Sequence, residues 1–91
     1  MTLDIQHARA LKRFQVVVDG STCALDYLLD GNVMGITHTE VPPAVGGRGI
    51  AGELVRTALD YARSRGWKVM PVCSYAAAWI ERHPAYRDLV A

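Results

Sequence analysis

The stretch Val-Pro-Pro-Ala-Val-Gly-Gly-Arg-Gly-Ile-Ala-Gly, residues 41–52, is the most informative segment of this chain. Two prolines end an extended segment, a glycine-rich turn follows, and an amphipathic helix begins directly after the turn. The first turn of a helix has backbone N–H groups without an internal partner, and the helix dipole adds positive potential there. Gly46, Gly47 and Gly49 have no Cβ, so an anion can approach those N–H groups closely, and Arg48 adds a cation. The stretch therefore predicts a site for a phosphate or pyrophosphate group.

The segments after this turn predict a helix, a strand and a second helix. The first helix is expected over residues 49–65, and Gly66 ends it. Residues 67–73 predict a strand, and a shorter helix over 75–82 is ended by His83-Pro84. The first helix has one apolar stripe, which consists of Ile50, Ala51, Leu54, Val55, Ala58, Leu59 and Ala62. A strand, a crossover helix and another strand imply a parallel pair with a right-handed connection.

The segments before the turn predict an antiparallel meander. Residues 14–18, 22–29 and 33–41 are expected to be its three strands, separated by two short polar turns. Leu3 and Ile5 are candidates for a short edge strand. The expected fold is α/β (α+β), with the meander joined to the parallel pair in one mixed sheet covered by helices.

Prolines occur on both strands of the expected parallel pair. Pro42 and Pro43 end the first strand, and Pro71 lies inside its partner. Because proline cannot donate a hydrogen bond to a ladder, we expect the strands to part here. The unpaired backbone groups would then line a cleft leading to the glycine turn. A ligand with a phosphate head and an extended, amide-bearing arm could use both features.

Composition narrows the class of protein. The formal net charge of +1 lacks the basic excess of dedicated nucleic-acid binders. No window approaches the ~20 apolar residues of a membrane span, and the start lacks a signal-peptide pattern. Cys23 and Cys73 lie fifty positions apart and fit no zinc or Cys-x-x-Cys spacing, so a reduced setting and no metal are expected. We expect one cytoplasmic domain over residues 1–91 that binds neither nucleic acid nor membrane.

Other phosphate sites fit the stretch less well. Residues 47–52 match the dinucleotide pattern Gly-x-Gly-x-x-Gly, which also requires an acidic residue about twenty positions further on. No acidic residue occurs between Asp60 and Glu81, and only one strand–helix–strand unit fits in the chain. A Walker P-loop is excluded because the chain has no Gly-Lys-Ser/Thr. A tight turn and helix cap that binds nothing is the remaining alternative.

At these residues the chain resembles the GNAT superfamily of acetyl-CoA-dependent N-acetyltransferases. Their pyrophosphate loop has the pattern Arg/Gln-x-x-Gly-x-Gly/Ala, and residues 49–51 match its second half. Segments 38–43, 47–51, 69–73 and 83–86 together resemble the small stand-alone YjdJ-type GNAT domains, over about residues 14–90. The resemblance implies a minimal GNAT fold that binds acetyl-CoA.

The resemblance also implies the residues that contact CoA. These are Val41, Pro42, Pro43, Gly46, Gly47, Arg48, Gly49, Ile50, Ala51 and Cys73. The first position of the motif falls on Gly46, where the family has a polar or charged residue. The tyrosine that protonates the leaving thiolate in many larger members falls on Ile80, beside Trp79. The chain also lacks the helices that shape the acceptor pocket in larger members.

Acetylation of an amine requires a deprotonated amine, so a nearby base assists the reaction. Period-two alternation predicts that Met34, Ile36, His38 and Glu40 share one face of the third strand, beside the cleft. Either His38 or Glu40 could be the base, and a structural polar pair is the alternative. Cys73 ends the second parting strand, where the resemblance puts the reactive end of the pantetheine arm. It could line the site, relay a proton or take the acetyl group first.

The sequence thus predicts an acetyl-CoA-dependent N-acetyltransferase in which an amine attacks the thioester directly. Two alternatives stay open: a non-catalytic CoA-binding or regulatory module of the same fold, and a phosphate-binding interaction domain unrelated to CoA. The acceptor side is expected to be shallow. It would suit a peptide or protein acceptor, or a partner chain that completes the pocket.

Overall fold

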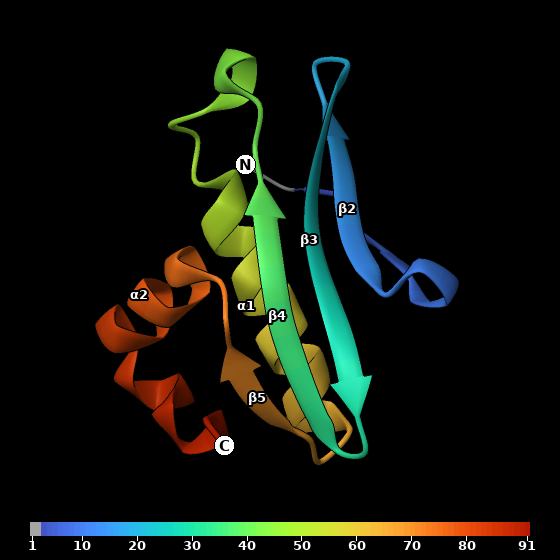
Figure 1. Cartoon of the computed structure of the whole chain (residues 1–91). Coiled ribbons are helices and arrows are strands. Elements are labelled where there is room, and N and C mark those ends of the chain that lie inside the picture. The colour runs from blue at the N-terminus through green and yellow to red at the C-terminus, as the bar shows by residue number, and fades with distance from the viewer. Residues whose placement is uncertain (1–2) are drawn as a thin grey trace.

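The fold is a five-stranded mixed sheet with two α-helices, seen in a computed structural model that describes residues 3–91 (Figure 1). Its strands lie in the order β1-β2-β3-β4-β5, antiparallel from β1 to β4 and parallel between β4 and β5. The strands are β1 (Gln6–Ala8), β2 (Arg13–Val18), β3 (Ser21–Asp30), β4 (Val33–Glu40) and β5 (Lys68–Pro71). The helices are α1 (Ile50–Ser64) and α2 (Ser74–Arg82), with 3-10 turns η1 (Arg9–Leu11), η2 (Pro43–Val45) and η3 (Pro84–Leu89). The predicted mixed sheet with a parallel pair joined by a helix is confirmed.

One face of the sheet carries the core. Alternate residues of β2 to β5 point toward α1, where the apolar stripe of the helix is buried except for the half-buried Ala51. The sheet contributes Phe14, Val16, Cys23, Leu25, Tyr27, Met34, Ile36 and Val69. Figure 1 shows α1 behind the strands and α2 beside β4 and β5, and no helix formed by residues 3–91 lies in front of the sheet. The described residues therefore leave the opposite sheet face uncovered.

A β-bulge in β4 changes which residues share a face. Tyr27 pairs with Ile36, but Asp26 pairs with His38, so Thr37 is an extra residue in β4. An inserted residue shifts the alternation of side chains by one position. Thr39 therefore lies on the helix side of the sheet. His38 lies on the uncovered side.

The bulge makes one expectation wrong. His38 and Glu40 share a face with each other, but not with Met34 and Ile36, because the bulge lies between the two pairs. An uninterrupted period-two pattern in the sequence hides an extra residue, since the bulge exchanges inner and outer positions without changing residue types.

The strands β4 and β5 part where the prolines predicted. Their pairing runs from Val33 opposite Lys68 to Ile36 opposite Pro71, and β4 then continues alone to Glu40. One hydrogen bond follows, from the Cys73 N–H to the Ile36 carbonyl at 2.8 Å. The strand is shorter than the predicted range 67–73 because Pro71 provides no N–H for a longer ladder.

The edge strand also differs from expectation. β1 begins at Gln6 rather than including Leu3 and Ile5, which are half-buried and pack against the core. Within β1, His7 lies on the inner side, stacked on Phe14 with 4.0 Å between ring centroids. Its Nε2 lies 2.6 Å from the Tyr27 hydroxyl. This aromatic cluster contacts Tyr61 near the end of α1, far along the helix from the glycine turn.

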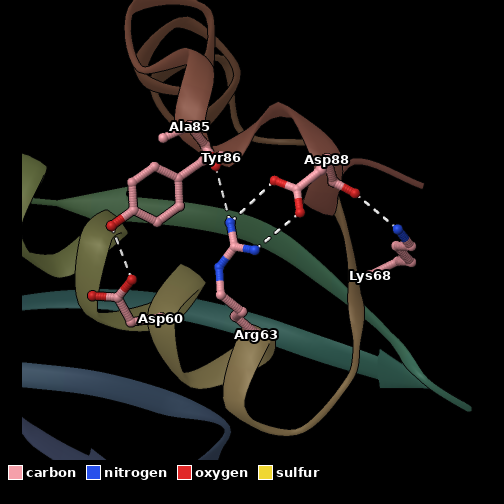
Figure 2. A network of polar contacts seen from close by, with 6 residues as sticks. All are labelled: Asp60, Arg63, Lys68, Ala85, Tyr86 and Asp88. Carbon is pink, nitrogen blue, oxygen red and sulfur yellow. Dashed lines mark hydrogen bonds and ion pairs between the residues drawn. The ribbon is translucent and has the colours of Figure 1, made fainter.

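Polar contacts hold η3 against the last turns of α1 (Figure 2). The Arg63 guanidinium donates to both carboxylate oxygens of Asp88, at 2.9 and 3.1 Å, and to the Ala85 carbonyl at 3.0 Å. The Tyr86 hydroxyl donates to Asp60 at 2.9 Å, and Lys68 donates to the Asp88 carbonyl at 2.8 Å. The segment after α2 is thereby fixed along α1 and β5.

Candidate functional site

The glycine turn and the start of both helices enclose a cavity of about 240 Å³. It is lined by Val41, Gly46, Gly47, Gly49, Ile50, Ala51 and Tyr75. Glu53 makes the first helical hydrogen bond of α1, from its N–H to the Gly49 carbonyl at 3.1 Å. The N–H groups of the preceding residues of the first turn have no partner within the helix. The cavity therefore combines open space with the donor end of a helix.

Two glycines of the turn are required by backbone conformation. Gly47 has φ +75° and Gly49, the N-cap of α1, has φ +78°, and side chains strongly disfavour this region. A Cβ on either residue would meet no atom within 4 Å. Both glycines thus border free space from which an anion can reach the backbone. The residues present fit a phosphate group.

The predicted cation is already paired. Arg48 Nη1 lies 2.7 Å from Asp19 Oδ2, in the turn between β2 and β3, and Arg48 is not part of the cavity lining. Pro42 and Pro43 are also outside the lining, and their carbonyls accept from the N–H groups of Val45 and Gly46 at 3.0 and 3.2 Å. The predicted contacts of these three residues with CoA stay predictions.

Cys73 lies at the opening between the parted strands, as the N-cap of α2. Its Sγ lies 3.7 Å from the Thr39 hydroxyl. Burial raises the pKa of the Cys73 thiol. Hydrogen bonds from the Ala76 backbone, from the Thr39 hydroxyl and from the Tyr75 and Thr39 backbones outweigh burial, so the pKa lies below its ordinary value. These donors stabilise a thiolate, as helix N-termini do for reactive cysteines.

His38 and Glu40 lie on the other side of the same opening. His38 Nε2 is 3.3 Å from Glu40 Oε1, and both side chains are exposed on the uncovered face. Asp26, opposite His38 in the ladder, pairs with Arg13 at 2.7 Å. Neither His38 nor Arg48 is among the groups that lower the pKa of Cys73. The two candidate bases and the cysteine therefore face opposite sides of the sheet.

Tyr75 lines this cavity, although no sequence motif predicts that it contacts CoA. It follows Cys73 by two positions in the first turn of α2, and α2 packs against the start of α1 at Gly52. A Cβ on Gly52 would lie 3.2 Å from Trp79 Nε1 and 3.5 Å from the Tyr75 hydroxyl. The sequence signal that could have indicated this close packing is Gly52, a glycine on the face of α1 that meets Tyr75 and Trp79. Ile80, at the usual tyrosine position, is buried in the core.

Two further findings concern residues 3–91. No helix in this range is both long and apolar enough to cross a membrane. No group of three or more His, Cys, Asp or Glu side chains in it is arranged to hold a metal ion.

Known proteins resemble the chain over nearly its whole length. Residues 13–89 match the family model described as GCN5-related N-acetyl-transferase. Protein NATD1 of Gallus gallus is 32% identical over 85 residues, covering 90% of this chain and 77% of that protein. Protein NATD1 of Homo sapiens is 32% identical over 83 residues, covering 88% and 74%.

A solved structure agrees with the sequence comparison. The solution NMR structure of a GCN5-like N-acetyltransferase candidate from Staphylococcus aureus superposes with a TM-score of 0.77 at 26% identity. It covers 98% of this chain and 88% of that one. Together with the parted parallel strands and the glycine turn at the start of α1, these matches establish that the chain belongs to the GCN5-related N-acetyltransferase family.

Proposed function

We propose that this protein is an acetyl-CoA-dependent N-acetyltransferase in which an amine attacks the thioester directly. The observation that carries the proposal is the cavity between the glycine turn and Tyr75, which adjoins the opening between β4 and β5. Backbone N–H groups at the start of α1 would hold the pyrophosphate of CoA. The unpaired backbone beyond Ile36 and Pro71 would hold the amide-bearing arm, and acetyl-CoA supplies the activated acyl group.

The two faces of the opening support different tasks for this chain's residues. On the uncovered face, Glu40 or His38 would take a proton from the incoming amine. On the helix face, Cys73 and Thr39 would line the thioester end. A backbone N–H near Val41 would stabilise the oxyanion that forms when the amine attacks. The amine and the thioester would then meet in the opening itself.

The lowered pKa of Cys73 supports a second route, in which its thiolate takes the acetyl group and later passes it to the amine. Direct transfer stays our proposal, because exchanging one thioester for another gains little free energy. Intact mass after incubation with acetyl-CoA alone separates the routes. Direct transfer predicts no stoichiometric acetyl adduct and retained activity in Cys73→Ala. A stoichiometric adduct that disappears in Cys73→Ala, together with parallel-line kinetics, would establish the covalent route.

A non-catalytic CoA-binding module is the other candidate, favoured by the buried Ile80 at the position of the usual acid. Acetyl-CoA turnover over a broad panel of amines distinguishes the two. A thermal-shift screen of CoA, acetyl-CoA, NAD and nucleotides tests the ligand itself. A shift with CoA and no turnover with any amine supports the module. No shift at millimolar CoA removes both candidates.

A further inference from the structure

The uncovered sheet face carries a groove of about 220 Å³ that begins at the bulge in β4. It is lined by Leu28, Val33, Gly35, Met70 and Val72, with Thr37 at one end and Asp30 at the other. Thr37 is the bulge residue, so the groove adjoins the strand opening beside His38 and Glu40. The candidate base and the groove therefore form one continuous surface.

The groove presents large apolar side chains to solvent. Leu28 is 62% exposed, Met70 54% and Val72 63%. The ladder places Leu28 and Met70 on either side of Gly35, which has no side chain to cover the floor between them. Single exposed apolar residues are ordinary, whereas a group of them around a depression is typical of a binding surface.

Charge at the two ends limits what can occupy the groove. Asp30 is the charged residue of its lining, and Glu40 lies beyond its other end. Of two nearby cations, Arg13 is paired with Asp26, whereas Lys68, the ladder partner of Val33, keeps its charge but is directed toward Asp88, whose backbone carbonyl accepts from it at 2.8 Å. An occupant with a positive group at each end and an apolar group between them would complement this surface.

The spacing along β4 suits an extended chain. Asp30 pairs with Val33, which lies four residues before Thr37, a separation of about 13 Å at the rise of a strand. In an extended peptide, side chains at positions i, i+2 and i+4 point to one side and span the same distance. A lysine, an apolar residue and a basic residue at this spacing would reach the opening, the apolar floor and Asp30.

We propose that the acceptor is a lysine in an extended basic peptide segment that lies in this groove, with an apolar residue two positions from the lysine and a basic residue four positions from it. This inference rests on the proposed function for the identity of the reacting amine. The groove itself can be tested without acetyl transfer, because peptide binding requires no acetyl-CoA.

The binding experiment titrates the ¹⁵N-labelled protein with the end-blocked peptide Lys-Ser-Leu-Ser-Arg and with its reversed sequence. We expect saturable shifts of the Leu28, Met70 and Val72 amide signals for at least one order. Leu28→Ser and Met70→Ser should weaken binding about tenfold, as loss of a central apolar contact does. Val17→Ser is the matched control, because Val17 is 66% exposed on the same face outside the groove. It should bind like the unmodified protein.

Comparison peptides test the chemistry of each position. Replacing the leucine by serine, or the arginine by glutamate, should weaken binding, and Asp30→Asn should reduce the preference for arginine over glutamate. Equal binding of these peptides, or equal effects of Val17→Ser and Leu28→Ser, would overturn the proposal. A dimer in sedimentation that Leu28→Ser dissociates would also overturn it, because a second copy would then occupy the groove.

The two proposals fail separately. Peptide binding that maps to the groove without any thermal shift from CoA would support the peptide groove and contradict the proposed acetyltransferase. A CoA shift with efficient acetylation of small free amines, unaffected by Leu28→Ser, would leave the acetyltransferase and remove the peptide groove.

Discussion

Cys73 owes its acidity to neighbours on two different elements. The Ala76 and Tyr75 N–H groups belong to α2, whereas the Thr39 hydroxyl reaches the sulfur from β4 only because the bulge turns Thr39 to the helix side. A hydrogen bond to a charged group favours the charged form and lowers the pKa of an acid. Thiolate formation is therefore favoured by the start of α2 and, in part, by a distortion in a neighbouring strand.

Thr39→Val should raise the pKa of the Cys73 thiol, because it removes one donor to the thiolate. One unit of pKa corresponds to about tenfold in thiolate fraction, so we expect alkylation by iodoacetamide at pH 7 to slow by up to about tenfold. The pH midpoint of the rate should rise from below 9.0 toward that ordinary value. Thr39→Ser keeps the hydroxyl and should keep the rate. Equal slowing in both variants would show that the hydroxyl is not the cause.

The glycine turn should be sensitive to bulk at Ala51, a half-buried residue in the cavity lining. Ligand binding to the folded state alone at a hundred times Kd adds about 2.7 kcal/mol of stability. Under the proposed function, Ala51→Leu should remove the expected thermal shift from CoA while leaving the free protein folded, because the new side chain occupies the space above the helix N-terminus. Ala78→Leu, at an exposed position on α2, is the control and should keep the shift.

At the scale of elements, α1 and α2 approach each other at Gly52. Its absent Cβ leaves room for Trp79 Nε1 and the Tyr75 hydroxyl. Gly52→Leu should overpack this contact and reduce the free energy of unfolding by about 1–3 kcal/mol. The same leucine at the neighbouring exposed position, Glu53→Leu, should have a smaller effect in chemical denaturation. A similar loss in both variants would contradict close helix packing as the role of Gly52.

The docking of β1 on β2 should depend on pH through His7. Burial lowers the pKa of His7 from 6.5, with a further contribution from Arg9, while the unfolded chain keeps the ordinary value. The unfolded state then binds more protons than the folded state below pH 6.5. The stability that His7 contributes is therefore complete above pH 6.5 and is lost as pH falls toward the lowered pKa. Between pH 7.5 and 5, the free energy of unfolding measured with urea should fall more for the unmodified protein than for His7→Gln. Parallel pH profiles for the two proteins would exclude His7 as the source.

The sequence could predict the elements because their patterns are local. The stripe of α1 repeats at helical spacing, and the turns at Gly49 and Gly66 need positive φ, which singles out glycine. The parting of β4 and β5 was also predictable, because Pro71 has no backbone N–H and cannot donate a hydrogen bond to any ladder.

The features that the sequence could not predict depend on contacts between distant residues. Nothing in the residue types around Thr37 distinguishes a bulge from regular alternation, since Thr, His and Glu suit either side at a strand end. The pairing of Arg48 with Asp19 joins residues 29 positions apart and requires the turn after β2 to reach the glycine turn. Tyr75 enters the cavity because α2 packs on α1, which the order of residues in α2 alone does not specify.

At the scale of the whole molecule, the sheet separates two approaches to one opening. The glycine turn, Cys73 and both helices lie on one side, whereas His38, Glu40 and the groove lie on the other. Under the proposed function, acetyl-CoA and the amine would reach the opening from opposite faces. Their binding would then be independent and would not exclude each other.

This arrangement predicts a ternary complex and sequential kinetics. Initial rates at several fixed amine concentrations should give intersecting lines in double-reciprocal plots, whereas transfer through Cys73 would give parallel lines.

Glu40→Gln should reduce kcat by about 10²-fold or more if Glu40 is the base. The same variant should leave the thermal shift from acetyl-CoA unchanged, because Glu40 faces away from the glycine turn. Asp19→Asn alters the partner of Arg48, on the same side of the sheet as the glycine turn. This variant should change the thermal shift from acetyl-CoA more than it changes kcat. The opposite result is that Glu40→Gln weakens the binding of acetyl-CoA and Asp19→Asn lowers kcat alone. It would mean that the two substrates do not approach from separate faces.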